Sequence, residues 1–159
     1  SNLKESFRLN SMLNTGLEST TLTIDEEYSE QIRSQSEKYI YKVLCEKYGV
    51  EKVNWLNLDG ESYKPCDFEI LDANGVVTIY IECKGTPREK PTFYMSDNEW
   101  TFFLKNKSCY QVYRVFNMDI ENEHIHIDDL YAHLTDGRVV PYLSKAEVVK
   151  ENRVFLTVV

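Results

Sequence analysis

The 159-residue sequence lacks any apolar run of the roughly 18 residues that a membrane-spanning helix needs. It also lacks the basic start and apolar stretch of a secretory signal peptide. Its four cysteines are Cys45, Cys66, Cys83 and Cys109, with no Cys-x-x-Cys pair and no histidine at zinc-ligand spacing. We therefore expect an intracellular, cytoplasmic protein with reduced thiols. A disulfide between Cys66 and Cys83 stays open, because the hairpin register described below places them opposite each other.

Positive charge is in short supply, with 18 Lys and Arg against 26 Asp and Glu and a net charge of −8. This balance counts against broad nucleic-acid affinity, which depends on Lys and Arg neutralising phosphates. The charge is uneven, however, because acidic residues concentrate in 18–30 and 119–129 while 84–114 is locally basic. The length fits a single domain, and a local basic surface on it is compatible with the sequence.

The first regular element expected is a helix over residues 25–48. Thr23 and Glu26 have the spacing of a capping box, and Gly49 follows the last periodic residue as a stop signal. Residues 1–22 show little periodicity, and we interpret them as a flexible lead-in or the end of a linker.

Glu37 lies on the apolar stripe of that helix, one turn before Ile40. A carboxylate at the edge of a buried face is costly unless it is paired or liganded. The alternative is a glutamate at the border of the stripe that reaches into solvent, which is the preferred interpretation for an isolated helix. The other members of the stripe are Tyr41, Leu44 and Tyr48.

The stretch 79–86, IYIECKGT, has the alternation of a strand that ends at Gly85. One face is apolar and should face the core; it carries Val77, Ile79, Ile81 and Cys83. The other face carries Thr78, Tyr80, Glu82 and Lys84, with both charges at the C-terminal end.

A second strand-like run, 66–71, precedes this strand, and Asn74-Gly75 between them predicts a hairpin with a two-residue type I′ turn. That register places Asp67 directly opposite Glu82. Facing carboxylates repel, so either Lys84 or a divalent cation such as Mg²⁺ should offset the repulsion. The plainer alternative is a solvated strand face with a Glu82–Lys84 salt bridge.

A further helix is expected over 97–105, since Ser96 and Glu99 form a second capping box. Capping suffices to explain Ser96, Asn98 and Glu99; the functional alternative is that this helix N-terminus faces a phosphate. The helix should bury Trp100, Phe103 and Leu104.

His124 and His126 should line an exposed strand face without binding metal. The remaining predicted elements are strands over 50–58, 109–117, 124–127 and 154–158 and a short helix over 128–134.

The order of these charged residues resembles that of the PD-(D/E)XK nuclease superfamily. A helix glutamate comes first, then an aspartate that begins one strand, and then Glu-x-Lys at the end of the next strand. The resemblance is closer to one branch of this superfamily, the family of the C-terminal domain of the protein NO VEIN. The matching segments are KPCDFEI, IYIECKGT, FYMSDNEW and YQVYRVFN, within residues 30–117. The chain departs from the superfamily motif at Pro65, because Cys66 stands between this proline and Asp67.

The resemblance implies a restriction-endonuclease-like α/β domain over 23–159, with a mixed β-sheet flanked by helices. It implies that Asp67, Glu82 and the backbone carbonyl of Cys83 bind Mg²⁺, with Mn²⁺ as an alternative. Lys84 would orient or activate the attacking water and stabilise charge on the phosphate, and Glu37 would complete the catalytic set.

The function implied is metal-dependent hydrolysis of DNA by an endonuclease domain. We expect it to belong to a larger defence or DNA-processing protein and to be fused to or associated with other domains such as an ATPase. The alternative is a catalytically silent module of the same fold that binds nucleic acid or protein. Residues expected to contact nucleic acid are Arg88, Lys90, Ser96 and Asn98.

Overall fold

This computed structural model describes residues 18–88, 92–141 and 153–159, and these residues form a long helix, two β-sheets and two short helices. The helices are α2 (Glu18–Tyr48), α3 (Asp97–Lys105) and α4 (Leu130–Thr135). The strands are β1 (Val53–Trp55), β2 (Phe68–Leu71), β3 (Val77–Gly85), β4 (Thr92–Ser96), β5 (Tyr110–Phe116), β6 (Glu123–Ile127), β7 (Val139–Pro141) and β8 (Arg153–Val158). Among the described residues, no helix has the length and apolar character needed to cross a membrane.

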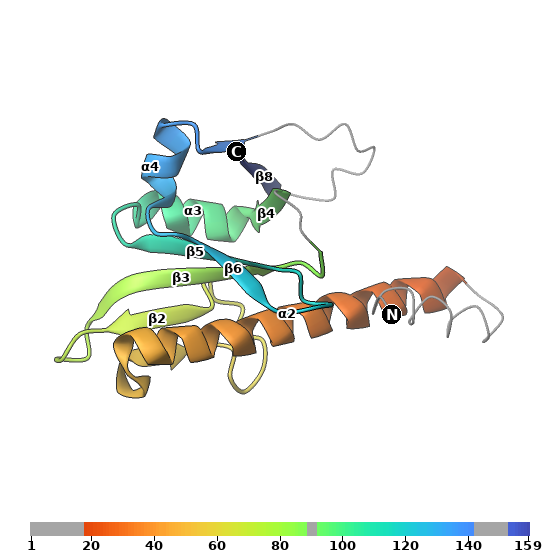
Figure 1. Cartoon of the computed structure of the whole chain (residues 1–159), viewed down its shortest axis with the longest axis horizontal. Coiled ribbons are helices and arrows are strands. Elements are labelled where there is room, and N and C mark those ends of the chain that lie inside the picture. The colour runs from red at the N-terminus through yellow and green to blue at the C-terminus, as the bar shows by residue number, and fades with distance from the viewer. Residues whose placement is uncertain (1–17, 89–91, 142–152) are drawn as a thin grey trace.

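The larger sheet has five strands in the order β1-β2-β3-β5-β6, and the smaller sheet has the order β4-β8-β7. In the larger sheet only β3 and β5 run parallel, whereas the other neighbours are antiparallel. Helix α2 lies along one side of this sheet, and α3, α4 and the smaller sheet lie on the other (Figure 1). The predicted α/β fold, a mixed sheet flanked by helices, is confirmed.

Both faces of the larger sheet are buried, so the protein has two hydrophobic cores. Between α2 and the sheet, Ile40 and Leu44 pack in a cluster with Phe68, Ile81 and Val115. On the opposite face lies the second cluster, made of Cys66, Phe93, Met95, Phe103, Tyr110, Val112, Ile127, Leu130, Val139 and Leu156. The charged face of β3 therefore points into the protein and not into solvent.

The turn of the β2–β3 hairpin differs from the predicted type I′ turn. Gly75 donates its N–H to the carbonyl of Asp72, and Asp72 donates to Val76, so Ala73 and Asn74 are the central turn residues. A type I′ turn needs positive φ at both central residues, but in this turn only Gly75 has positive φ, at 78°. The turn shifts the pairing by one residue relative to the prediction.

A β-bulge in the same hairpin restores the predicted register. Between Ile70 and Leu71 the pairing shifts by one residue, and Thr78 donates its hydroxyl to the Ile70 carbonyl at this point. Phe68 consequently pairs with Ile81 as the simple hairpin would require. The predicted alignment of the strand ends is therefore correct although the predicted turn is wrong.

Several predicted boundaries need correction. Helix α2 continues through Thr23 to Glu18, so residues 18–22 are helical and Thr23 does not begin the helix; residues 1–17 lie outside the described part. The strand predicted over 50–58 is a 3₁₀ turn at Val50–Lys52 followed by the short β1. The predicted α3 has the observed bounds and capping box.

Side-chain burial corrects two further predictions, on Leu104 and on the two histidines, and decides the open question of a Cys66–Cys83 disulfide. Leu104 is exposed on α3, while Phe103 is buried. His124 and His126 are half-buried and do not line an exposed face. His124 forms a hydrogen bond with Tyr39 of α2, and the ring of His126 stacks on that of Tyr113. All four cysteines are free, and Cys66 and Cys83 lie in cores on opposite faces of the sheet.

Gly85 allows α2 to approach β3 closely. A Cβ atom at this glycine would lie 2.6 Å from the Oγ and 2.8 Å from the Cβ of Ser36. The Cβ of Ser36 cannot withdraw without moving the helix, so the absence of a side chain at residue 85 sets the distance between α2 and the end of β3.

Gly85→Ala should lower the free energy of unfolding by about 1–3 kcal/mol, the usual cost of overpacking. Urea denaturation measures this change. In a double-mutant cycle with Ser36→Gly, the combined loss should be smaller than the sum of the single losses, because the second substitution relieves the contact. Additive losses would contradict the close approach as the cause.

Candidate active site

Asp67 lies just before β2, where the β2–β3 ladder ends. Its N–H donates to the carbonyl of Ile81 at 2.9 Å, which is also the residue that Phe68 pairs with. Its side chain continues the hydrogen bonding to β3 beyond the end of the backbone ladder, because Oδ2 accepts the N–H of Cys83 at 2.8 Å. The carboxylate of Asp67 is thus fixed against the backbone of β3.

Glu82 and Lys84 project from β3 toward α3. Lys84 Nζ lies 2.8 Å from Oε1 of Glu82 and 2.7 Å from Oε2 of Glu99. The same Oε2 accepts the N–H of Ser96 at 2.9 Å, as part of the capping box of α3. The lysine is therefore held between one carboxylate of its own strand and one anchored at the start of a helix.

Glu37 reaches the site from α2, on the other face of the sheet. Its side chain is buried, with Oε2 accepting Trp55 Nε1 at 2.8 Å and Oε1 accepting an Arg33 N–H at 3.1 Å. Asn57 Nδ2 lies 3.3 Å from Glu37 Oε2 and donates to Asp67 Oδ1 at 2.8 Å. The predicted helix acid thus contacts the site through Asn57.

Burial and mutual repulsion dominate the electrostatics of the acids. Burial, together with the charge of Glu37, raises the pKa of Asp67 to about 7. Burial and the nearby Asp67 carboxylate raise the pKa of Glu82 well above its usual value, despite the opposing effect of Lys84. For Lys84 the attraction of Glu82 and Glu99 exceeds the effect of burial and raises its pKa, so the lysine stays protonated at neutral pH.

The arrangement fits a small divalent cation that is held by few protein ligands. Glu82 is buried and Asp67 is half-buried, and the two carboxylates repel each other, as facing ligands of a cation do. The N–H of Cys83 points toward Asp67, and in a strand the carbonyl of the same residue points to the same neighbour. No group of three or more His, Cys, Asp or Glu that could hold a metal is present among the described residues, whereas Mg²⁺ is usually bound by one or two carboxylates.

The residues expected to contact nucleic acid are not all available for it. Ser96 uses its hydroxyl to accept the N–H of Glu99, so it acts as a helix cap. Asn98 is exposed beside it in the first turn of α3, and Arg88 is exposed after β3. Lys90 lies outside the described residues.

Three residues with structural roles at the site escaped the sequence reasoning. Asn57 links Glu37 to Asp67, and Glu99, predicted only as a cap, also holds Lys84. Arg114 is buried and donates to the carbonyls of Lys84 at 2.8 Å and Thr92 at 3.1 Å, which joins the end of β3 to the start of β4. A polar residue within an otherwise apolar strand, as in YQVYRVF, was the available signal for Arg114.

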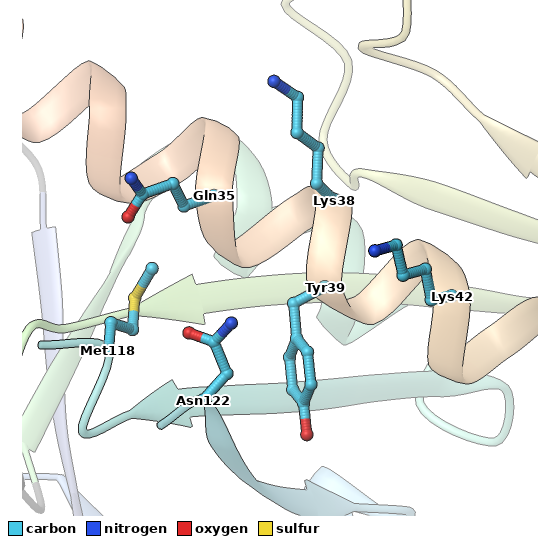
Figure 2. A pocket seen from close by; sticks show the side chains of 6 residues that line it. All are labelled: Gln35, Lys38, Tyr39, Lys42, Met118 and Asn122. Atoms are coloured by element: carbon cyan, nitrogen blue, oxygen red, sulfur yellow. The ribbon is translucent and has the colours of Figure 1, made fainter. Parts of the chain in front are cut away.

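A surface hollow of about 340 Å³ lies away from these residues. Four of its lining residues come from α2, and Met118 and Asn122 come from the segment between β5 and β6 (Figure 2). The four are Gln35, Lys38, Tyr39 and Lys42. Burial and, to a smaller extent, the charges of Glu121 and Glu123 raise the pKa of Tyr39. Acidic residues therefore lie near the lysines of this hollow, which do not form a purely basic surface.

The stability of the protein in chelator should fall as pH rises from about 4 to 7. The pKa values of Asp67 and Glu82 are raised in the folded state, so the folded state binds more protons than the unfolded state in this range. Glu82→Gln should therefore raise the free energy of unfolding above pH 7 by about 1 kcal/mol or more and change it little near pH 4.

Chemical denaturation at several pH values measures this effect. Glu46→Gln is the matched control, because Glu46 is exposed on α2. If Glu82→Gln and the wild type show parallel pH profiles, the two carboxylates do not repel each other in the folded state.

Comparison with known proteins places the chain in a family. The model of the family described as Protein NO VEIN, C-terminal, matches residues 36–127, more than half of the chain, and the match includes Glu37, Asp67, Glu82 and Lys84. The comparison with curated proteins returned no match, and neither did the comparison with solved structures. With four sequence segments and the family match in agreement, the chain belongs to the family of the NO VEIN C-terminal domain.

Proposed function

We propose that the protein hydrolyses phosphodiester bonds of DNA with the help of a divalent metal. The observation that carries the proposal is the meeting of Asp67, Glu82 and Lys84 at the ends of two paired strands, with Glu82 buried, Asp67 half-buried and the two acids repelling each other. Buried like charges are costly in a purely structural role, and strongly shifted pKa values concentrate at functional sites.

Lys84 acts as a fixed cation in this proposal. Glu82 and Glu99 keep it protonated, so it is poorly suited to take a proton from water at neutral pH. A protonated ammonium that is already oriented stabilises the negative charge that develops on the phosphate during hydrolysis. This favours charge stabilisation and orientation of water over activation of water by Lys84.

The residues that would hold Mg²⁺ or Mn²⁺ are Asp67, Glu82 and, through its backbone carbonyl, Cys83. When bound, the metal supplies positive charge to the phosphate and acidifies water near neutral pH. Asp67 is kept in place by Cys83 N–H and by Asn57, and Asn57 also contacts Glu37. Glu37 therefore acts as a positioning residue behind Asp67.

A binding module of the same fold is the second candidate function. The net charge of −8 favours it. The acids also have partners within the protein, because Lys84 forms a salt bridge with Glu82 and Asn57 donates a hydrogen bond to Asp67. The two functions differ in what Lys84 does, because a module that only binds does not need an ammonium between two carboxylates.

The protein should cut DNA in Mg²⁺ or Mn²⁺ and not in EDTA. Lys84→Ala should abolish cutting while leaving metal binding largely intact, whereas Asp67→Ala and Glu82→Ala should lose both. Residues that act as one unit are non-additive, so the double variant of Asp67 and Lys84 should be no worse than the worse single variant. Plasmid, linear and single-stranded DNA serve as substrates.

Lys107→Ala is the control for this experiment, because Lys107 is a lysine beyond the C-terminus of α3 and lies over Tyr131. It should cut like the wild type. Binding of DNA without cutting, together with no measurable effect of Lys84→Ala, would replace the enzyme with the binding module.

Mg²⁺ should raise the melting temperature of the wild type, because a ligand that binds the folded state stabilises it by mass action, by about 2.7 kcal/mol at a hundred times Kd. Glu82→Gln should remove this shift, and Lys84→Ala should keep it. Thermal melts with and without metal measure both. An equal shift in wild type and Glu82→Gln would place the bound metal elsewhere.

A further inference from the structure

The outer face of β4 carries an aromatic ring next to Lys84. Phe93 and Met95 point into the core, whereas Tyr94 between them points outward and is 42% exposed. Arg153, the exposed first residue of β8, pairs with Ser96 across the strands, and its Cζ lies 4.1 Å from the centroid of the Tyr94 ring. Lys84 Nζ lies 5.6 Å from the same centroid.

The stacked pair of Tyr94 and Arg153 differs in charge from the acidic cluster beside it. Lys84 forms salt bridges with both Glu82 and Glu99, which neutralise its charge. Among the described residues no carboxylate forms a salt bridge with Arg153, so its guanidinium is a cation next to the site that can meet an incoming phosphate. Arginine suits this role, because its planar fork binds phosphate oxygens through two N–H groups.

Both members of the pair are also stacking surfaces. Unpaired bases stack on aromatic side chains and on guanidinium planes, and an aromatic ring in a cationic setting is the usual element of single-strand binding. A base inside a duplex is already stacked on its neighbours, so it can reach such a surface only where the strand is unpaired.

We propose that Tyr94 and Arg153 hold an unpaired nucleotide of the substrate strand, with the base on the stacked pair and its phosphate on the guanidinium, beside Lys84. This inference rests on the proposed function and adds the substrate class, a single-stranded or locally opened strand. Neither residue belongs to the set expected from the sequence to contact nucleic acid.

The test compares the affinity of the protein for labelled single-stranded and duplex DNA of one sequence, measured in EDTA by fluorescence anisotropy. Tyr94→Ala and Arg153→Gln should each weaken single-strand binding by about tenfold or more and weaken duplex binding less. Tyr94→Phe keeps the ring and should bind like the wild type.

Two matched controls are available. Tyr131 is 45% exposed on α4, with Lys107 Nζ 4.8 Å from its ring centroid, so Tyr131→Ala removes a similar ring–cation pair elsewhere. Arg138 is an exposed arginine just before β7 of the same sheet, and Arg138→Gln removes the same charge. Both variants should bind single strands like the wild type.

The outcomes separate this inference from the proposed hydrolysis. If the wild type binds single strands through Tyr94 but does not cut in Mg²⁺, hydrolysis fails and the strand contact stands. If the wild type cuts and Tyr94→Ala leaves both affinity and kcat/KM unchanged, the strand contact is overturned and hydrolysis stands. Equal losses with single strands and duplex, equal losses in the Tyr131→Ala control, or no wild-type binding in EDTA would also overturn the strand contact.

Discussion

The placement of two carboxylates, one buried and one half-buried, at the ends of β2 and β3 is the constraint on which the surrounding structure depends. The sheet is covered on both faces, so the buried Glu82 and the half-buried Asp67 have limited access to water that would stabilise their charges. Each acid receives specific donors instead, a backbone N–H and Asn57 for Asp67, and Lys84 for Glu82. The raised pKa values indicate that these donors offset the cost only in part.

Each layer of the protein contributes one support to this site. From α2 comes Glu37, connected through Asn57, and α3 contributes Glu99, whose carboxylate caps the helix and holds Lys84. Arg114 joins the end of β3 to the start of β4. Because these supports belong to different elements, the positions of the acids depend on the packing of the whole domain and not on one local motif.

The β2–β3 hairpin shows how a correct prediction can rest on an incorrect step. The alternation of β3 and its Glu82–Lys84 face followed from the sequence, and so did the alignment of Phe68 with Ile81. The predicted turn was wrong, but the bulge at Thr78 compensates for its shift. Buried side chains on one face strongly specify a register, so the core determines the alignment and the turn adapts to it.

Local chemistry determined what the sequence alone could predict, because strand alternation and helix capping depend on residues within a few positions. That was enough for the face shared by Glu82 and Lys84 and for the capping box of α3. Only the tertiary structure decided that this face is buried, that Asn57 joins two acids, and that Arg153 stacks on Tyr94. Strands β4 and β7 also escaped prediction, because each pairs with β8, which lies far along the chain. Such contacts form only when distant segments pack together, and a pattern of neighbouring residues does not predict which distant segments will do so.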